Sequence, residues 1–187
     1  MKLANALTYS HTLLTTTVER GDYVIDATVG NGHDTEFLSQ LVGPKGHVLG
    51  FDVQAAAIDS ATARLKAAKV ANVQLVLAGH ENVAQYLPAN QPVGGAIFNL
   101  GYLPGADKDV ITQGETTLAA INGILPNLKK NGLIVLVVYY GHPGGQAEVN
   151  QLLSFTQKLP QKAYHVLQYQ FINQANQPPY IIAIQKR

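Results

Sequence analysis

Hydrophobic positions along the chain fall into two alternating patterns. Short apolar runs rich in β-branched residues are typical of buried strands, and we expect them at residues 24–26, 47–51, 73–77, 93–98 and 133–139. Stretches with the apolar spacing of a helix lie between them, at about 34–41, 54–69, 111–130 and 146–158. Strands that alternate with helices form parallel sheets, so the pattern predicts an α/β fold.

The two ends of the chain depart from this alternation. Residues 1–20 show helical spacing with a break around Thr8 and predict a leading helical segment, in which His11 lies. A histidine in such a helix is more often packed or solvated than functional. Near the other end, strands are expected at 163–169 and 180–185 with only a polar, proline-containing loop between them. Without a crossover helix these two strands must pair antiparallel, so the sheet is mixed.

The segment from Val24 to Thr35 reads V-I-D-A-T-V-G-N-G-H-D-T and predicts a strand, a glycine loop and a helix. Glycines let a ligand approach the main chain, and the free N–H groups of the next helix favour anionic groups. A dinucleotide fingerprint requires G-x-G-x-x-G, but Thr28 and His33 occupy its first and third glycine positions. An acidic residue followed by G-x-G instead resembles the first motif of class I S-adenosylmethionine-dependent methyltransferases.

Further polar residues follow the next predicted strands. Asp52 closes the second strand, where a carboxylate can accept both ribose hydroxyls of an adenosine or simply cap a helix. His80 and Glu81 follow the third strand and should border the adenine, although a histidine at this place more often simply starts a helix. Asn99 and Tyr102 follow the fourth strand and offer an amide oxygen that accepts an amine hydrogen and a ring on which a planar group stacks. All these positions lie at one edge of a parallel sheet, where ligands bind.

Composition narrows the classes of protein. The 187 residues, 47% hydrophobic and 13% charged, suit one domain with a substantial core. The net charge of +1 gives no general affinity for nucleic acid, and the lysines are scattered. Cysteine is absent, and no histidines have the i, i+4 spacing of a helical zinc motif, so we expect no metal site. No apolar run suits a membrane span and no secretory signal is expected, which favours a cytoplasmic protein without a membrane partner.

Several segments together resemble one small bacterial family. D-A-T-V-G-N-G-H-D-T, H-E-N, N-L-G-Y-L-P-G-A-D-K, Y-Y-G-H-P-G-G and N-Q-P-P-Y occur in order over nearly the whole chain and resemble the family of rRNA methylase-like proteins. Members of that family are associated with tRNA 5-(aminomethyl)-2-thiouridine methylation. The resemblance implies a Rossmann-like class I methyltransferase with a mostly parallel seven-stranded sheet, an antiparallel C-terminal hairpin and helices on both faces. It also implies S-adenosyl-L-methionine as methyl donor and the tRNA anticodon region as partner.

The resemblance implies roles for individual residues. Asn99 to Tyr102 resembles the N-P-P-Y motif of amino-methylating enzymes, with Leu100 and Gly101 in place of both prolines. We expect Asn99 to orient the amine, Tyr102 to pack against the uracil, and Asp34 or His142 to help remove a proton. Asp26 and Asp52 are expected to hold the methionine and ribose parts of the cofactor. The expected cofactor-binding residues are Asp26, Thr28, Gly30, Asn31, Gly32, Asp52, Gln54, His80, Glu81 and Asn99.

Other functions remain open at this point. A methyltransferase acting on rRNA or on a small molecule fits the same features. A nicotinamide-dependent oxidoreductase is disfavoured by Thr28, His33 and the closing hairpin, and a non-catalytic RNA-binding module is disfavoured by the intact segment from Asn99 to Tyr102. The oligomeric state is also open, because an RNA much larger than the protein could be bound by one subunit or by a homodimer.

Overall fold

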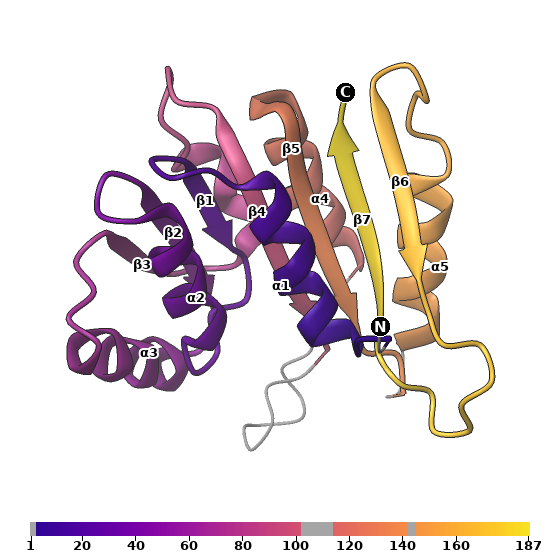
Figure 1. Ribbon diagram of the computed structural model, residues 1–187. Coiled ribbons are helices and arrows are strands. Elements are labelled where there is room, and N and C mark those ends of the chain that lie inside the picture. Colours follow the sequence, from indigo (N-terminus) through magenta and orange to yellow (C-terminus); the bar gives the residue numbers. More distant parts are fainter. Residues whose placement is uncertain (1–2, 102–113, 142–144) are drawn as a thin grey trace.

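The computed structural model describes residues 3–101, 114–141 and 145–187. Its centre is a seven-stranded sheet with the order β3-β2-β1-β4-β5-β7-β6 (Figure 1). The strands are β1 Tyr23–Asp26, β2 His47–Asp52, β3 Val73–Leu77, β4 Val93–Leu100, β5 Leu128–Val138, β6 Tyr164–Tyr169 and β7 Tyr180–Lys186. The first five strands are parallel, and β7 is antiparallel to both β5 and β6. The predicted mixed sheet with a C-terminal hairpin is confirmed.

Helices cover both faces of the sheet. They are α1 Ala6–Thr17, α2 His33–Val42, α3 Ala55–Ala67, α4 Gly114–Ile124 and α5 Gly145–Thr156, with short 3-10 helices η1 His80–Gln85 and η2 Leu125–Asn127. The helices α1 and α2 share a hydrophobic cluster with one face, whereas α4, α5 and η1 pack on the other face. None of the helices in the described ranges is long and apolar enough to cross a membrane.

The strand sequence explains this two-sided burial. Successive side chains of a strand point to opposite faces, so in β1 Val24 packs with α1 and α2 while Ile25 packs in the cluster with α4 and α5. Both side chains are fully buried. In β5 the residues from Ile134 to Val137 are fully buried too, as the nearly continuous β-branched sequence predicts for a strand that is covered on both sides.

The carboxyl ends of β1, β2, β4 and β5 meet at one edge of the sheet (Figure 1). The amino-terminal end of α1 lies at this edge. Tyr169, the last residue of β6, donates a hydrogen bond from its hydroxyl to the Ala4 carbonyl at 2.8 Å, and its ring lies 4.2 Å from that of Tyr9. These contacts fasten the start of the chain beside the β6–β7 loop.

The helix expected at residues 111–130 ends earlier than the sequence pattern indicated. α4 stops at Ile124 and is followed by η2, because Pro126 has no N–H to continue the helical hydrogen bonds. Leu128 already pairs with Val93 at the start of β5. Asn131 adopts a left-handed conformation with φ of 63° inside β5, where the pairing with β4 shifts register.

Candidate functional site

The glycine loop connects β1 to α2, as the sequence predicts. Gly30 and Gly32 both have positive φ, 51° and 78°, in the left-handed region that other residues adopt at a cost. A Cβ atom on Gly32 would also lie 2.9 Å from the Cβ of Ala61 in α3. The loop therefore needs glycine at position 32 for its backbone conformation and for its close contact with α3.

Asp52 at the end of β2 holds this loop. Its Oδ2 accepts the N–H of Gly30 at 2.8 Å, and its Oδ1 accepts the N–H of Gln54 at 2.9 Å. A carboxylate oxygen has more than one acceptor position, so each oxygen can accept another hydrogen bond. Asp52 thus fixes the loop and still offers acceptors to a ligand.

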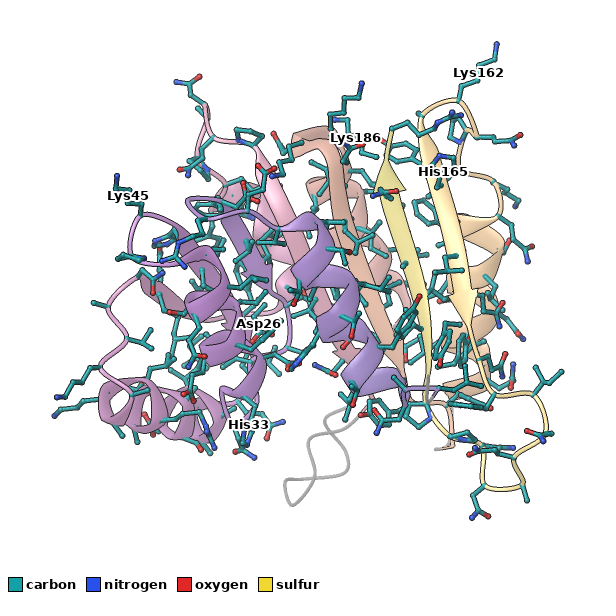
Figure 2. The ribbon with its side chains drawn as sticks, in the orientation of Figure 1. Asp26, His33, Lys45, Lys162, His165 and Lys186 are labelled. Atoms are coloured by element: carbon teal, nitrogen blue, oxygen red, sulfur yellow. The ribbon has the colours of Figure 1, made fainter. Side chains whose placement is uncertain are left out.

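Arg64 of α3 supports the outer side of the loop. Its Nε donates to the Asn31 carbonyl at 2.8 Å, and its guanidinium reaches Glu36 at 3.3 Å and the His33 ring at 3.0 Å. Figure 2 shows His33 at the carboxyl edge of the sheet. Arg64 therefore ties both the glycine loop and the first turn of α2 to α3.

A cavity of about 830 Å³ lies at the carboxyl edge of the sheet. Ligand pockets in proteins generally have volumes of roughly 300–1,000 Å³, so the cavity has room for a cofactor and part of a second molecule. The predicted site residues that line it are Thr28, Gly30, Asn31, Asp34, Asp52, Gln54, His80, Glu81 and Asn99. Four strand ends and their loops therefore bring these residues together, as expected from the sheet topology. Tyr102 and His142 lie outside the described residues.

Asp26 and Gly32 were expected to contact the cofactor, but neither lines the cavity. Asp26 is fully buried behind the loop, where it accepts hydrogen bonds from the Thr35 hydroxyl at 2.5 Å and the Thr28 N–H at 3.2 Å. Burial, together with the charge of Asp34, raises the pKa of Asp26 to about 7. The structure thus places Asp26 where it shapes the loop from behind and gives it no surface for direct contact with a ligand.

His80 lines the cavity and carries a buried acceptor atom without a partner among the described residues. Its Nδ1 donates to the Ala27 carbonyl at 3.0 Å, which leaves Nε2 with a lone pair in the neutral ring. The residue is only 8% exposed, and Nε2 is buried with no hydrogen-bond partner among the described residues. Burial lowers the pKa of His80, so the ring stays neutral near pH 7 and its Nε2 can accept a hydrogen bond from a ligand.

Asn99 is the second cavity residue with an unpaired acceptor. It belongs to β4, which extends to Leu100 instead of ending at residue 98 as predicted. The backbone N–H of Asn99 donates to the Thr28 hydroxyl at 2.7 Å, and its Nδ2 donates to Oδ2 of Asp34 at 2.7 Å. The amide oxygen is buried and has no partner among the described residues. A buried acceptor without a partner costs free energy, which a donor that reaches this oxygen would recover.

Sequence reasoning missed several residues that line the cavity. They include Leu7, Thr8, His11, His33, Thr116 and Tyr139. His11 is the most informative, because its Nε2 donates to Oδ1 of Asp34 at 2.7 Å. No motif marks this histidine, and only the packing of α1 against the sheet brings it to a carboxylate that is 23 positions away along the chain.

Among the described residues, no group of three or more His, Asp or Glu side chains could hold a metal ion.

Together the seven-stranded sheet with antiparallel β7, the glycine loop and the acidic end of β2 define a class I S-adenosylmethionine-dependent methyltransferase. Comparison with protein families gives a more specific assignment. The family model described as "Putative rRNA methylase" matches residues 48–185, and the chain belongs to this family. The resemblance that the sequence motifs indicated is confirmed.

Individual relatives agree with the assignment. A tRNA (mnm(5)s(2)U34)-methyltransferase of Arabidopsis thaliana chloroplasts is 37% identical over 178 residues, which cover 90% of this chain and 65% of that protein. This chain therefore spans about two thirds of the chloroplast relative. A putative rRNA methylase from Clostridium thermocellum is 40% identical with a TM-score of 0.97, and both chains are fully covered. A putative methyltransferase from Streptococcus mutans in complex with SAH is 40% identical over the full length of both chains, with a TM-score of 0.91.

Proposed function

We propose that the protein transfers a methyl group from S-adenosylmethionine to an exocyclic primary amine of RNA, namely the aminomethyl group of 5-aminomethyl-2-thiouridine at the tRNA wobble position. An amine as the methyl acceptor is supported chiefly by Asn99, a cavity residue whose amide oxygen is buried and has no partner among the described residues. The relative named for this wobble nucleoside supports the choice of RNA.

The cavity residues suit the cofactor. Asp52 offers carboxylate acceptors of the kind that ribose hydroxyls need, and the unpaired Nε2 of His80 suits the amine hydrogen of an adenine ring. Gly30 and Asn31 allow close approach to the main chain. A buried acceptor without a partner costs free energy, so a ligand that donates to His80 recovers that cost. In this proposal Asp52 and His80 hold the adenosine part.

The amide oxygen of Asn99 suits the substrate amine. An alkylamine has a pKa of roughly 10 in water, like lysine, and attacks only after it has lost a proton. Asn99 can then accept one of the remaining N–H groups and leave the nitrogen lone pair directed into the cavity. When bound, S-adenosylmethionine supplies a methyl group made electrophilic by its sulfur, and transfer of that methyl to the amine leaves S-adenosylhomocysteine and releases one proton to water. The chain contributes mainly orientation and the exclusion of water.

The distribution of carboxylates supports an RNA partner. No Asp or Glu occurs before Glu19 or after Glu148 in the sequence. α1, β6, β7 and the β6–β7 loop therefore carry no negative side chain. Leu7, Thr8 and His11 of α1 line the cavity, and Tyr169 at the end of β6 bonds to Ala4 just before α1. We call the start of α1 together with the β6–β7 loop the rim. RNA phosphates are repelled by carboxylates, so this rim is the side of the molecule that best admits RNA.

The rim differs from an ordinary basic patch. Figure 2 shows Lys45, Lys162 and Lys186 near the edge of the sheet opposite His33 and the cavity. The rim instead presents aromatic rings and amides, including Phe171, Gln170 and Tyr9. Such groups bind single-stranded loops by stacking and hydrogen bonding. They fit an anticodon loop better than a long duplex.

The proposal is tested by incubating the protein with deuterium-labelled S-adenosylmethionine and tRNA that carries 5-aminomethyl-2-thiouridine. The tRNA is digested and its nucleosides are measured by mass spectrometry. We expect a labelled 5-methylaminomethyl-2-thiouridine. Parallel reactions use tRNA with an unmodified wobble uridine and ribosomal RNA, and both should stay unlabelled. Label in ribosomal RNA alone would refute the proposed substrate while leaving the class of enzyme intact.

A further inference from the structure

We propose that His11 is a positioning residue for methyl transfer, which acts through Asp34 to hold the side chain of Asn99 with its carbonyl oxygen towards the acceptor amine. This inference rests on the proposed function, because it assumes an amine as acceptor. It adds a residue of the N-terminal helix to the site. His11 and Asp34 lie outside the residues that the family model matches, which begin at position 48.

Asp34 stands between the other two side chains. Its Oδ1 accepts Nε2–H of His11 and its Oδ2 accepts Nδ2–H of Asn99, both at 2.7 Å. An ionised carboxylate only accepts hydrogen bonds, so it forces the NH₂ group of the Asn99 amide to face Asp34. The carbonyl oxygen must then face the opposite way, where it is buried and without a partner among the described residues.

This orientation matters for an amine substrate. A nucleophilic amine can donate its N–H groups to an acceptor while its lone pair points at the methyl group. If the amide were turned over, its NH₂ group would bind the lone pair that has to attack. With its carbonyl oxygen towards the amine, Asn99 therefore leaves the amine nitrogen free to attack, whereas the flipped amide would block it.

The backbone of Asn99 is held by a contact that does not involve Asp34. Asp34 therefore has to fix only the orientation of the Asn99 side chain. The Thr28 hydroxyl accepts the N–H of Asn99 at 2.7 Å and ties the end of β4 to the glycine loop. That bond sets the position of the Cα atom but does not select one orientation of the amide. Of the described contacts of the Asn99 side chain, the bond to Asp34 is the one that does so.

His11 in turn is well placed to hold Asp34. Its ring stacks on Phe37 with centroids 3.9 Å apart and planes only 4° from parallel. Asp34 and Phe37 are three positions apart in α2, a spacing that puts them on the same helix face. The imidazole is thus confined between two residues of one helix turn, and its Nε2 is directed at the carboxylate. The Asp34 side chain is only 13% exposed, so little water is available to replace His11.

The charged state of Asp34 agrees with this role. Burial by itself would raise the pKa of Asp34, but the hydrogen bonds from His11 and Asn99, together with the charges of His11 and His33, outweigh burial and lower the pKa below its ordinary value. The carboxylate therefore stays ionised at neutral pH and keeps its acceptor-only character. Because the lowered pKa also makes Asp34 a weak base, we assign it orientation in place of the proton removal that was expected from the sequence.

The test compares His11→Ala with His11→Gln, since the Gln amide can restore an N–H donor near the position of Nε2. We expect His11→Ala to lower kcat for methylation of the modified tRNA by about 10- to 100-fold, with the Kd for S-adenosylhomocysteine within about twofold of the parent. His11→Gln should regain most of the lost kcat. Thr12→Ala, an exposed substitution in the neighbouring position of α1, is the matched control and should behave like the parent.

A second measurement does not need a substrate. The side-chain amide protons of Asn99, identified by their loss in Asn99→Ala, should exchange slowly with solvent in the complex with S-adenosylhomocysteine. His11→Ala should speed this exchange by about tenfold or more, and His11→Gln should restore slow exchange. If the parent protein fails to methylate the tRNA, the proposed function falls, but the exchange rates still decide whether His11 holds Asn99.

The outcomes that overturn the inference are specific. Unchanged kcat and unchanged amide exchange in His11→Ala would show that Asn99 is held without His11. A His11→Gln variant as defective as His11→Ala in both measurements would rule out a role as hydrogen-bond donor. A large loss of cofactor affinity or of thermal stability in His11→Ala would assign the residue to cofactor binding or to folding.

Discussion

At the scale of single residues, two carboxyl groups beside the glycine loop differ in their surroundings. Asp52 lines the cavity and accepts backbone N–H groups from Gly30 and Gln54. Asp26 is fully buried, and its pKa is raised to about 7 by burial and by the neighbouring charge of Asp34. The first is placed to bind a ligand, and the second is placed to shape the loop.

Asp52→Asn should weaken the binding of S-adenosylhomocysteine by roughly 10- to 100-fold, because hydrogen bonds to a charged group contribute about 1.5–3 kcal/mol. The amide keeps the shape of the carboxylate but replaces one of its acceptors with a donor. Isothermal titration calorimetry measures the change. Asp59→Asn, an exposed substitution in α3, serves as the control and should leave Kd unchanged. Equal affinities in both variants would remove Asp52 from the binding site.

Asp26→Asn should change how stability depends on pH. The pKa of Asp26 is about 7 in the folded protein and its ordinary value is 3.8, so between these values the folded state binds the extra proton. The contribution of Asp26 to stability is therefore complete below about pH 4 and is lost as the pH rises towards 7. Relative to Asp26→Asn, the parent should lose up to about 1.4 kcal/mol per pH unit in this window, with no further loss above it. Thermal unfolding of both proteins from pH 4 to 8 measures the difference, and parallel curves would contradict it.

Sequence reasoning found the residues that follow a strand but missed those that reach the cavity from elsewhere. Asp52, His80 and Asn99 could be predicted because each stands next to a recognisable apolar run. His11 could not be assigned, since its place in the cavity depends on how α1 packs against the sheet. Asp26 was expected to touch the ligand, but it is buried behind the loop, and the sequence does not show which side of a loop a carboxylate occupies.

At the scale of elements, the glycine loop packs closely against α3, so a substitution at Gly32 should measurably lower the stability of the fold. Gly32→Ala combines a positive φ, which costs an ordinary residue about 1–2 kcal/mol, with a Cβ only 2.9 Å from that of Ala61. Gly21→Ala introduces the positive-φ cost alone, because nothing lies within 4 Å of its Cβ position. We expect Gly32→Ala to be less stable than Gly21→Ala by a further ~1–3 kcal/mol in denaturant unfolding. Equal losses would show that α3 moves away freely.

Most elements could be predicted from local pattern, and the errors occur where long-range pairing decides. The strands and the closing hairpin follow from apolar runs and from the loop before Tyr180. The end of α4 was misplaced because residues 125–130 carry a mixed pattern that fits a helix as well as a strand. Pro126 was the local signal for the helix end, and the pairing of Leu128 with Val93 completes the change to β5.

At the scale of the whole molecule, the carboxylate-free rim predicts how charge affects RNA binding. Gln170→Glu adds one negative charge to the β6–β7 loop, and Gln74→Glu adds the same charge to β3 at the far end of the sheet. Because RNA binding falls with each added repulsive charge near the phosphates, Gln170→Glu should weaken tRNA binding by a few-fold at low salt. Gln74→Glu should not, and neither should alter the Kd for S-adenosylhomocysteine. Equal effects of the two variants on tRNA binding would place the RNA elsewhere.

The central claim is that the cavity at the carboxyl edge of the sheet presents a bound methyl donor to an amine held by Asn99. The most direct test is the single-turnover rate of methyl transfer to the modified tRNA by Asn99→Ala, measured beside the calorimetric affinity for S-adenosylhomocysteine. We predict a rate at least roughly 100-fold lower than that of the parent, with cofactor affinity within about twofold. A rate equal to that of the parent would contradict the account, because the amine would then be oriented by another group.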